Sequence, residues 1–590
     1  MKKIILSVAL IATGFTAANA AVDIKSEVDN KSYSLAGTFG THDFEGKESA
    51  FDWAFTASNG QSYQLQGKAP SKNDVFGWKE VSITAPTPAW YMFSLGSDVD
   101  GDGSKKFDWM LLSTDMDNKA AYKLKGEKSN GTFDYSAKID VDYTMIENTI
   151  YLGSISDSGV TVEDKVNFLR GYAEVAQLSY EDAVAGAQGL KTAVDAFVAA
   201  PTQITLDAAK EAWKTSREKY SMSEIFRLSN GPIDAEGDWQ EDAYGALEGQ
   251  INAWPLDEGM IDYVTDAEHN EKTQGKNIIN TTGMFTPSGG EAVDVTNITA
   301  DVLTALNENG GDANVATGYH AIEFLLWGQD QDYDNGMIVD DVTHGPAVAG
   351  NRPFTDYTTS DNADRRKDYL VAATNKMLAD LKTVASAWKD GVNGNTGRYR
   401  AAFLGELTGV DATDNLATDT ALSNVFSGMG TFAKSELANE RIAIAVLDPS
   451  EEDEHSCFSD QTHRDIYLNF RGFANVMKNE YPTGNSLGGK TMGELISNET
   501  KSKVMPVVMD ILARTQSISD TAEGTHASNN KTHFDWQVRD DNADMKQNII
   551  TAKNQMRTLG DLVVNIARDF GINFITSNVT DNEETPGYAD

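Results

Sequence analysis

The sequence of 590 residues contains a single cysteine, Cys457. One cysteine cannot form an intramolecular disulfide, so each domain must be stabilised by the packing of its core. We interpret Cys457 as a small buried hydrophobic residue, because free cysteines are among the most buried residue types. The alternative interpretation is a soft metal ligand or a redox-active thiol.

Long apolar runs are also scarce. After the first twenty residues, no apolar run reaches the ~18 to 20 residues needed to cross a bilayer. The first twenty residues start with two lysines, continue through the apolar run 4–10 and end in the Ala-Asn-Ala tripeptide 18–20, which together predict a secretory signal peptide. The next residue is Ala21 and not the cysteine that a lipid anchor requires. We therefore expect a mature protein that begins at Ala21 and is located in the periplasm or cell envelope.

Basic residues are few in this chain. It has 49 lysine and arginine residues against 89 aspartate and glutamate residues, a formal net charge of −40. Removal of the signal peptide would leave −42, because residues 1–20 contain two lysines and no acid. This excess argues against nucleic acid and anionic lipid as partners. We interpret it as a means of solubility in a salty environment, and a surface that attracts cations is the alternative.

Residues 21–157 have the pattern of β-strands. Polar and apolar residues alternate over 133–139, aromatic residues concentrate in 90–95, and glycine, asparagine and aspartate recur between such runs. A mature chain of about 570 residues is longer than one core supports, so several domains are expected. We predict an all-β domain, sandwich or barrel-like, for this segment.

An acidic loop at residues 98–104 lies within this predicted β-domain. Its aspartates occupy alternate positions, and a glycine follows where a ligand loop must turn, as in calcium sites. An EF-hand would have glutamate at the twelfth position, which is Trp109 here, so we expect a structural calcium clip and not a helix-loop-helix switch. The predicted calcium ligands are Asp98, Asp100, Asp102, Ser104 and Asp108. An acidic turn without an ion is the alternative.

After about residue 160 the sequence changes to alanine-rich segments with helical spacing. Apolar residues recur three and four apart over 190–198, and Pro201 ends that run. Further helical patterns cover 208–226, 365–384 and 544–570. We predict an all-α region that continues to the end of the chain.

One predicted helix contains the sequence Gly318-Tyr-His320-Ala-Ile-Glu323. His320 and Glu323 are three residues apart, so both side chains project from the same face of a helix. An imidazole and a carboxylate together suit iron, zinc, copper or manganese better than calcium. A hydrogen-bonded pair without an ion is the alternative.

The Gly-x-His-x-x-Glu pattern is followed by Phe-Leu-Leu-Trp-Gly at 324–328, and the whole resembles the signature of the imelysin family. Other stretches similar to that family are 212–217, 223–227, the Gly-Pro-Ile-Asp turn 231–234 and 249–255. Two more, 352–366 and 454–463, resemble its iron-regulated protein A branch. The resemblance covers about residues 160–580 and leaves the predicted β-domain outside.

This resemblance implies two imelysin-like helical bundles that form one globule, which we assign to 158–390 and 391–590. It also implies that the helix carrying His320 and Glu323 lies near the interface of the bundles, with further metal ligands on neighbouring helices. Glu224 and Asp234 are the next candidate ligands, because they sit in matching motifs. His455 and His463 of the late motif rank below them. Capping or interbundle hydrogen bonding is the alternative role for these four residues.

Two functions are compatible with this resemblance. The first is a non-enzymatic metal-binding protein of the cell envelope that binds iron or haem for uptake or storage, with an envelope iron-transport component as its partner. Iron is the expected metal, and zinc and copper are alternatives. The second is a metallopeptidase, the activity for which the family was named. We favour the first and assign no catalytic residue, because the chain has no His-Glu-x-x-His pentad. A polymer- or peptide-binding module is a third alternative.

Overall fold

The computed structural model describes residues 160–235, 239–265, 276–329, 349–389, 397–447, 454–524, 533–539 and 542–572, together with the backbone of short strands at 50–140 and 271–272. The chain divides into two compact units, 1–159 and 160–590, which we describe separately. The predicted signal peptide lies outside the described residues.

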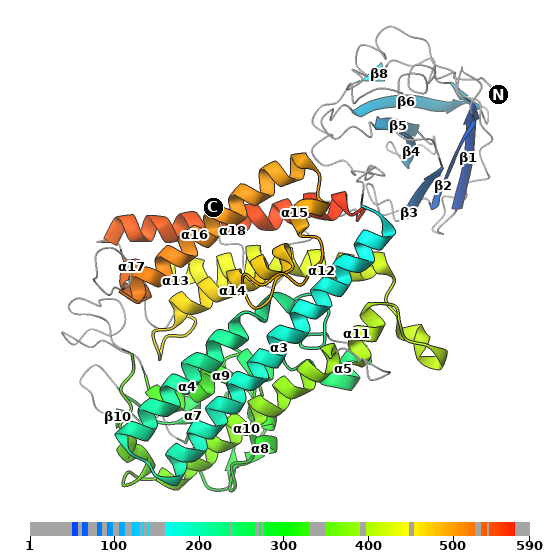
Figure 1. Ribbon diagram of the computed structural model, residues 1–590. Helices are drawn as coiled ribbons and strands as arrows, with labels where there is room; N and C mark the ends of the chain where they lie inside the picture. Colours follow the sequence, from blue (N-terminus) through cyan, green and yellow to red (C-terminus); the bar gives the residue numbers. More distant parts are fainter. Residues whose placement is uncertain are drawn as a thin grey trace. The chain divides into compact units, whose positions relative to one another are not determined.

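The first unit contains two antiparallel sheets, whose strands are blue in Figure 1. Their strands are β1 (Ala50–Thr56), β2 (Ser62–Lys68) and β3 (Glu80–Thr84) in one sheet, and β4 (Tyr91–Ser97), β5 (Lys106–Leu112), β6 (Ala121–Ser129), β7 (Thr132–Asp134) and β8 (Ile139–Asp140) in the other. Sequential strands pair in the order β1-β2-β3 and β4-β5-β6-β7, and β8 also pairs with β6. Their arrangement as a sandwich or barrel stays a prediction.

The predicted calcium loop falls between β4 and β5, which pair as antiparallel neighbours with Ser97 opposite Lys106. Asp98, Asp100, Asp102 and Ser104 lie outside the described residues. Asp108 belongs to β5, where its backbone pairs with Leu95. The calcium site therefore also stays a prediction.

Four helices build the first half of the second unit. They are α3 (Val162–Ala199), α4 (Gln203–Ser221), α9 (Gly318–Trp327) and α10 (Ala363–Trp388). Threonine caps begin the first two: Thr161 accepts the N–H of Asp164, and Thr202 accepts that of Thr205. α3 packs against both α4 and α10, and α9 contacts α4 and α10.

The long connection from α4 to α9 consists of short elements. These are η2 (Glu224–Phe226), α5 (Trp239–Tyr244), α6 (Glu248–Asn252), α7 (Glu258–Ile261), β9 (Val264–Thr265), β10 (Glu271–Lys272), β11 (Met284–Phe285), β12 (Val293–Asp294) and α8 (Ala300–Leu306). Of these, η2 contacts both α12 and α14 of the second half, and α6 contacts α9.

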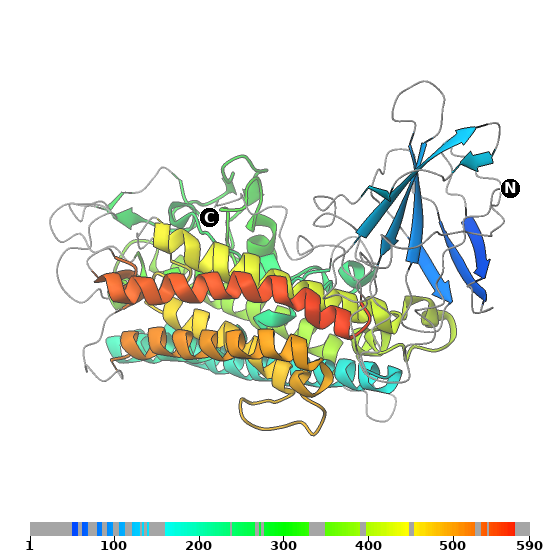
Figure 2. The ribbon, with the colours of Figure 1, turned by 90° about the horizontal axis from the view of Figure 1, so that it is seen from above.

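The second half contains a long helical run followed by three further helices. The helical run consists of α12 (Thr418–Thr431), η5 (Phe432–Ala443) and α13 (Ile444–Leu447), and the further helices are α14 (Thr462–Lys478), α16 (Asn498–Ala522) and α18 (Ala543–Asp569). The short elements of this half are α11 (Arg398–Phe403), η4 (Gly409–Asp414), α15 (Met492–Leu495) and α17 (Phe534–Gln537), whereas η3 (Phe354–Tyr357) precedes α10 in the first half. α18 packs against α12, η5 and α16, and Figure 2 shows α16 and α18 running side by side.

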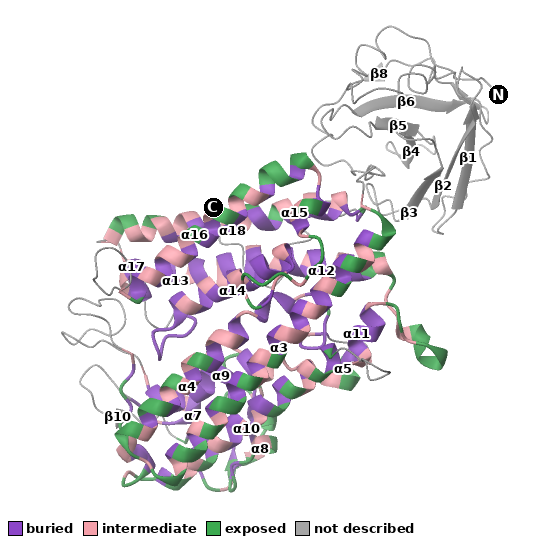
Figure 3. Cartoon of the chain, in the orientation of Figure 1, coloured by how far each residue is buried: buried purple, intermediate pink, exposed green. Residues whose placement is uncertain are grey.

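Both halves share one hydrophobic core. Buried residues lie on the inner faces of the helices (Figure 3), and the core cluster runs from α3 to α18 and includes Cys457. The halves meet where α14 contacts α4 and η2 and where α12 contacts α3. The prediction of a helical region is therefore confirmed for 160–570, which is mostly helical. The predicted boundary near residue 390 falls in the interval 390–396, outside the described residues. No described helix is long and apolar enough to span a membrane.

Candidate functional site

The Gly-x-His-x-x-Glu sequence forms the start of α9, whose ten residues are all buried. Gly318 has φ +83°, and a Cβ added to it would lie 2.4 Å from the carbonyl oxygen of Ile251 at the end of α6. Only glycine fits this close approach without strain. The motif glycine thus allows α9 to begin directly against α6 and places His320 in the interior.

His320 and Glu323 contact each other on the same face of α9, as their spacing predicts. His320 Nδ1 lies 3.1 Å from Glu323 Oε2. The other carboxyl oxygen of Glu323 accepts the backbone N–H of Ser459 at 3.0 Å and its hydroxyl at 2.6 Å. Both oxygens of Glu323 are therefore engaged, and Ser459 comes from the turn that precedes α14.

The electrostatic state of this pair follows from its burial. Burial lowers the pKa of His320 well below its usual value, with the neighbouring His455 and Arg217 acting in the same direction. Burial also raises the pKa of Glu323 to about 8, which the hydrogen bond from Ser459 only partly offsets. His320 Nε2 is buried and meets no hydrogen-bond partner in the described part of the chain. The pair thus holds a neutral imidazole with one nitrogen available.

A second imidazole lies against the first. The rings of His320 and His455 are edge to face, with centroids 4.7 Å apart. His455 Nδ1 is 2.8 Å from Asp465 Oδ2, so each of the two rings has a carboxyl group at its Nδ1. Burial, followed by the charge of Arg441, lowers the pKa of His455 to about 4.

Asp465 is the most heavily hydrogen-bonded carboxylate of this region. Its oxygens receive Arg217 Nε and Nη2, each at 2.9 Å, and the hydroxyls of Ser221 at 3.0 Å and Ser456 at 2.6 Å. Burial would raise the pKa of Asp465, but Arg217 and His455 outweigh it and hold the pKa well below its usual value. Asp465 therefore stays ionised, and its Oδ2 can accept a proton from His455 Nδ1, a nitrogen that also lies 3.1 Å from Arg217 Nη2.

Glu224, a predicted metal ligand, belongs to an ion-paired network next to these histidines. It pairs with Arg441, lies 3.7 Å from Arg217, and accepts the Nδ2 groups of Asn252 at 3.2 Å and Asn469 at 3.1 Å. Burial would raise its pKa, but the two arginines together keep the pKa below its usual value. Both oxygens of Glu224 are thus occupied by donors of the protein itself.

Arg441 reaches Glu224 from an unusual piece of backbone. Residues 432–443 form a π-helix between α12 and α13, and π-helical segments are rare in proteins. One π-helical turn separates Glu436 from Arg441, whose Nη2 lies 2.7 Å from Glu436 Oε1. The spacing of five residues is not a neighbour pair of an α-helix, so the sequence pattern gave no signal for it.

The remaining predicted ligand, Asp234, forms hydrogen bonds with the backbone of the turn in which it lies. Its carboxylate accepts the backbone N–H groups of Leu228 and of Gly231, the latter at 3.0 Å. Burial raises its pKa to about 6. Asp234 therefore organises the Gly-Pro-Ile-Asp turn.

The structure thus brings together His320, Glu323, His455 and, through Arg217, Glu224. Within the described ranges, no three His, Cys, Asp or Glu side chains converge as a ready-made metal cage. The sequence pattern missed Ser459 and Asp465 as partners of the two histidines. Their only signal was their place in or next to the late motif 454–463, every residue of which is buried.

Comparison with known proteins identifies the family of this chain. The family model for imelysin (Peptidase_M75) matches residues 176–563, more than half of the chain. The chain therefore belongs to the imelysin family. It is also similar to iron-regulated protein A of Synechococcus elongatus, with 34% identity over 79 residues, which are 13% of this chain and 19% of that protein. The match thus spans about a fifth of the length of that relative.

Among solved structures, the chain is similar to one described as an iron-regulated protein A precursor from Parabacteroides distasonis. The two are 16% identical, the alignment covers 70% of this chain and 96% of the other, and the TM-score is 0.46.

Proposed function

We propose that this protein is an exported metal-binding protein of the cell envelope, in which His320 binds a transition-metal ion for iron supply. The observation that carries the proposal is His320 Nε2, a buried nitrogen without a hydrogen-bond partner among the described residues. A buried polar atom left unsatisfied costs about 1–3 kcal/mol and calls for an explanation. A metal ion bound to Nε2 would satisfy this nitrogen.

The surroundings of His320 fit a metal ligand. Metal-binding histidines commonly donate their other ring N–H to a carboxylate, which fixes the orientation of the ring. Glu323 occupies that position at His320, and Asp465 occupies it at His455. We therefore propose Nε2 of both imidazoles as the ligands, with water or a delivered ligand completing the coordination. In this proposal Glu323 positions His320, and Glu224 and Asp234 support the fold.

The choice of ion rests on chemistry and on the relatives. Imidazole ligands suit iron, zinc and copper, so these three are the candidates. Iron is the first to test, because the relatives are named as iron-regulated proteins. An ion is favoured over haem, because all of α9 is buried and offers no open face to a porphyrin. A metallopeptidase is not favoured, because both oxygens of Glu323 are already engaged and no second carboxylate of the described ranges bonds to His320.

Metal analysis of the mature protein tests this proposal. The protein is purified from its native compartment without chelators, beside His320→Gln and a control, Tyr319→Phe. The control perturbs the same buried helix by removing the hydrogen bond between Tyr319 and Ser216 but removes no nitrogen. We expect the parent and the control to contain iron and the His320 variant to lose it with unchanged circular dichroism. Equal metal content in all three proteins would contradict the proposal.

We also propose that the loop between β4 and β5 binds calcium as a structural ion. The support is the spacing of its aspartates. Calorimetric titration of calcium into the full mature chain should give one binding event that the Asp100→Asn, Asp102→Asn double variant lacks. An absence of heat at millimolar calcium in the parent would rule this site out.

A further inference from the structure

A small pocket is lined in part by Ser459, the residue that donates a hydrogen bond to Glu323. It has a volume of about 200 Å³ and is lined by residues of α4, the turn before α14, α14 itself and the adjoining ends of α16 and α17. The lining residues that matter are Lys214, Ser459, Asp460, His463, Glu523 and His533. This volume is below the roughly 300–1,000 Å³ of pockets for drug-sized ligands, so an ion or a very small molecule is the expected occupant.

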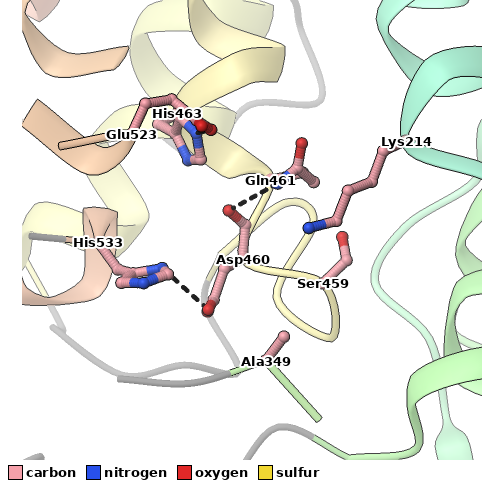
Figure 4. A pocket seen from close by; sticks show the side chains of 8 residues that line it. All are labelled: Lys214, Ala349, Ser459, Asp460, Gln461, His463, Glu523 and His533. Carbon is pink, nitrogen blue, oxygen red and sulfur yellow. Dashed lines mark hydrogen bonds and ion pairs between the residues drawn. The ribbon is translucent and has the colours of Figure 1, made fainter. Parts of the chain in front are cut away.

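Two of these residues are histidines, and each has a carboxylate partner. His463 Nε2 lies 2.8 Å from Glu523 Oε1, and His533 Nδ1 lies 2.9 Å from Asp460 Oδ2. Figure 4 shows His463 and His533 approaching Asp460 from two sides, with Lys214 on a third. The arrangement of an imidazole fixed by a carboxylate thus occurs twice in one pocket.

One nitrogen of this pocket lacks a partner. His463 is almost fully buried, and its Nδ1 meets no hydrogen-bond partner within the described part of the chain. Because Glu523 engages the other ring nitrogen, the lone pair at Nδ1 is directed away from that carboxylate. A nitrogen lone pair held in this way is a ligand for a transition metal, whereas calcium and magnesium prefer oxygen.

The charges around the pocket favour a cation over an anion. Asp460 and Glu523 line it, and the buried carboxyl of Asp535 lies close enough to Asp460 to interact with it electrostatically. Lys214 is the positive side chain on the pocket wall. Among the residues that line the pocket, the two carboxylates therefore outnumber the one ammonium group.

We propose that this pocket is a second metal site, for a divalent transition-metal ion such as Zn²⁺ or Cu²⁺. His463 Nδ1 and the nitrogen of His533 that Asp460 does not engage are the ligands, and Glu523 and Asp460 hold the two rings. Since no three potential ligands converge among the described residues, water completes the coordination. The site is separate from His320, and Ser459 lies between the two.

Zinc titration of the metal-free full mature chain in the His320→Gln background tests this inference, because that substitution removes the first proposed site. We expect a Zn²⁺ binding event that weakens at least about 100-fold when His463→Gln is added, since a ligand is lost. The same event should weaken roughly 10- to 100-fold in Glu523→Gln, because that carboxylate only orients the ring. Glu523 is partly exposed, so this variant keeps the test valid if His463→Gln does not fold.

The Lys214→Met variant tests whether the pocket binds a cation or an anion. Removal of the positive side chain should strengthen Zn²⁺ binding by roughly two- to fivefold, the size expected for a partly exposed charge. Weaker Zn²⁺ binding in this variant, or an event that His463→Gln and Glu523→Gln leave unchanged, would overturn the inference. Titration of inorganic phosphate provides the opposite probe, and phosphate binding that depends on Lys214 would also overturn it.

Discussion

Two buried glutamates of the helical unit differ in one respect, the number of cations around them. Glu224 has Arg441 and Arg217 beside it, and these outweigh burial and lower its pKa. Glu323 accepts hydrogen bonds from Ser459 and feels the charge of Arg217, but these do not outweigh burial, which raises its pKa to about 8. Glu224 is an ion-pair partner, whereas Glu323 is close to neutral at physiological pH.

This difference separates a structural carboxylate from a candidate functional one. A buried charge is tolerated when it is paired, and removal of one partner leaves the other charge uncompensated. The Glu224 network is balanced by the protein itself. The region of His320 is not, since among the described residues His320 Nε2 has no hydrogen-bond partner and Glu323 forms no ion pair with a lysine or an arginine. A metal ion would supply the positive charge that this region lacks.

The largest expected effect on stability is that of the Glu224→Gln substitution. It leaves Arg441 and Arg217 without their shared carboxylate, so we expect a loss of about 3–5 kcal/mol in the free energy of unfolding at pH 7. Guanidinium denaturation measures this loss. Glu218→Gln is the matched control, because Glu218 pairs with Arg464 at a partly exposed position and should cost under about 1 kcal/mol. If Glu224→Gln lowered the free energy of unfolding no more than the control does, Glu224 would not be the ion-pair partner described here.

The same substitution at Glu323 should have the opposite effect on stability, an increase in the free energy of unfolding. The folded-state pKa of Glu323 lies above its unfolded value, so the stability that protonation provides is complete below about pH 4 and is lost as the pH rises toward about 8. Glutamine resembles the protonated acid and does not titrate. In metal-free protein at pH 8, Glu323→Gln should therefore be more stable than the parent by on the order of 2 kcal/mol.

Denaturation of the parent and of Glu323→Gln at pH 4 and pH 8 checks this prediction. The advantage of the variant should shrink toward zero at the lower pH, where the parent is protonated. A variant that is less stable than the parent at pH 8 would show that Glu323 is ionised and already compensated.

The smallest expected effect is that of Ser459→Ala. It removes the hydroxyl that donates to Glu323 at 2.6 Å but keeps the backbone N–H at 3.0 Å. We expect a loss of about 1 kcal/mol and a further rise in the pKa of Glu323, because one hydrogen bond to its charged form is gone. Thermal unfolding measures the first effect. A steeper loss of stability between pH 6 and pH 9 in the variant would confirm the second.

Much of the helical unit could be predicted from local patterns. Spacing of three and four residues predicted helices, and the same rule placed His320 and Glu323 on one face of α9, where they contact each other. Asp234 could also have been assigned correctly from its sequence, since an aspartate that ends a Gly-Pro-Ile-Asp turn is well placed to accept backbone N–H groups of that turn.

The roles of Glu224 and His455 could not be predicted in this way. Glu224 became a candidate ligand because it lies in a family motif, but its partner Arg441 is 217 residues later in the chain and within a π-helix. His455 ranked low as a candidate, yet its ring contacts His320. Neither contact can be inferred from the spacing of residues in the sequence, because each depends on how distant segments pack.

The sequence by itself determined the helical periodicity and the pairing of His320 with Glu323, because these depend on residues within one turn of one helix. The need for glycine at position 318 came from the tertiary structure, because it depends on the close approach of Ile251 in α6. Only the tertiary structure decided which buried carboxylates meet arginines and which imidazole nitrogens stay without partners. The physical reason is that the electrostatic state of a buried group depends on every charge within a few ångströms. Around His320 those charges come from α4, the π-helix, the turn before α14 and α14 itself, which meet only after folding.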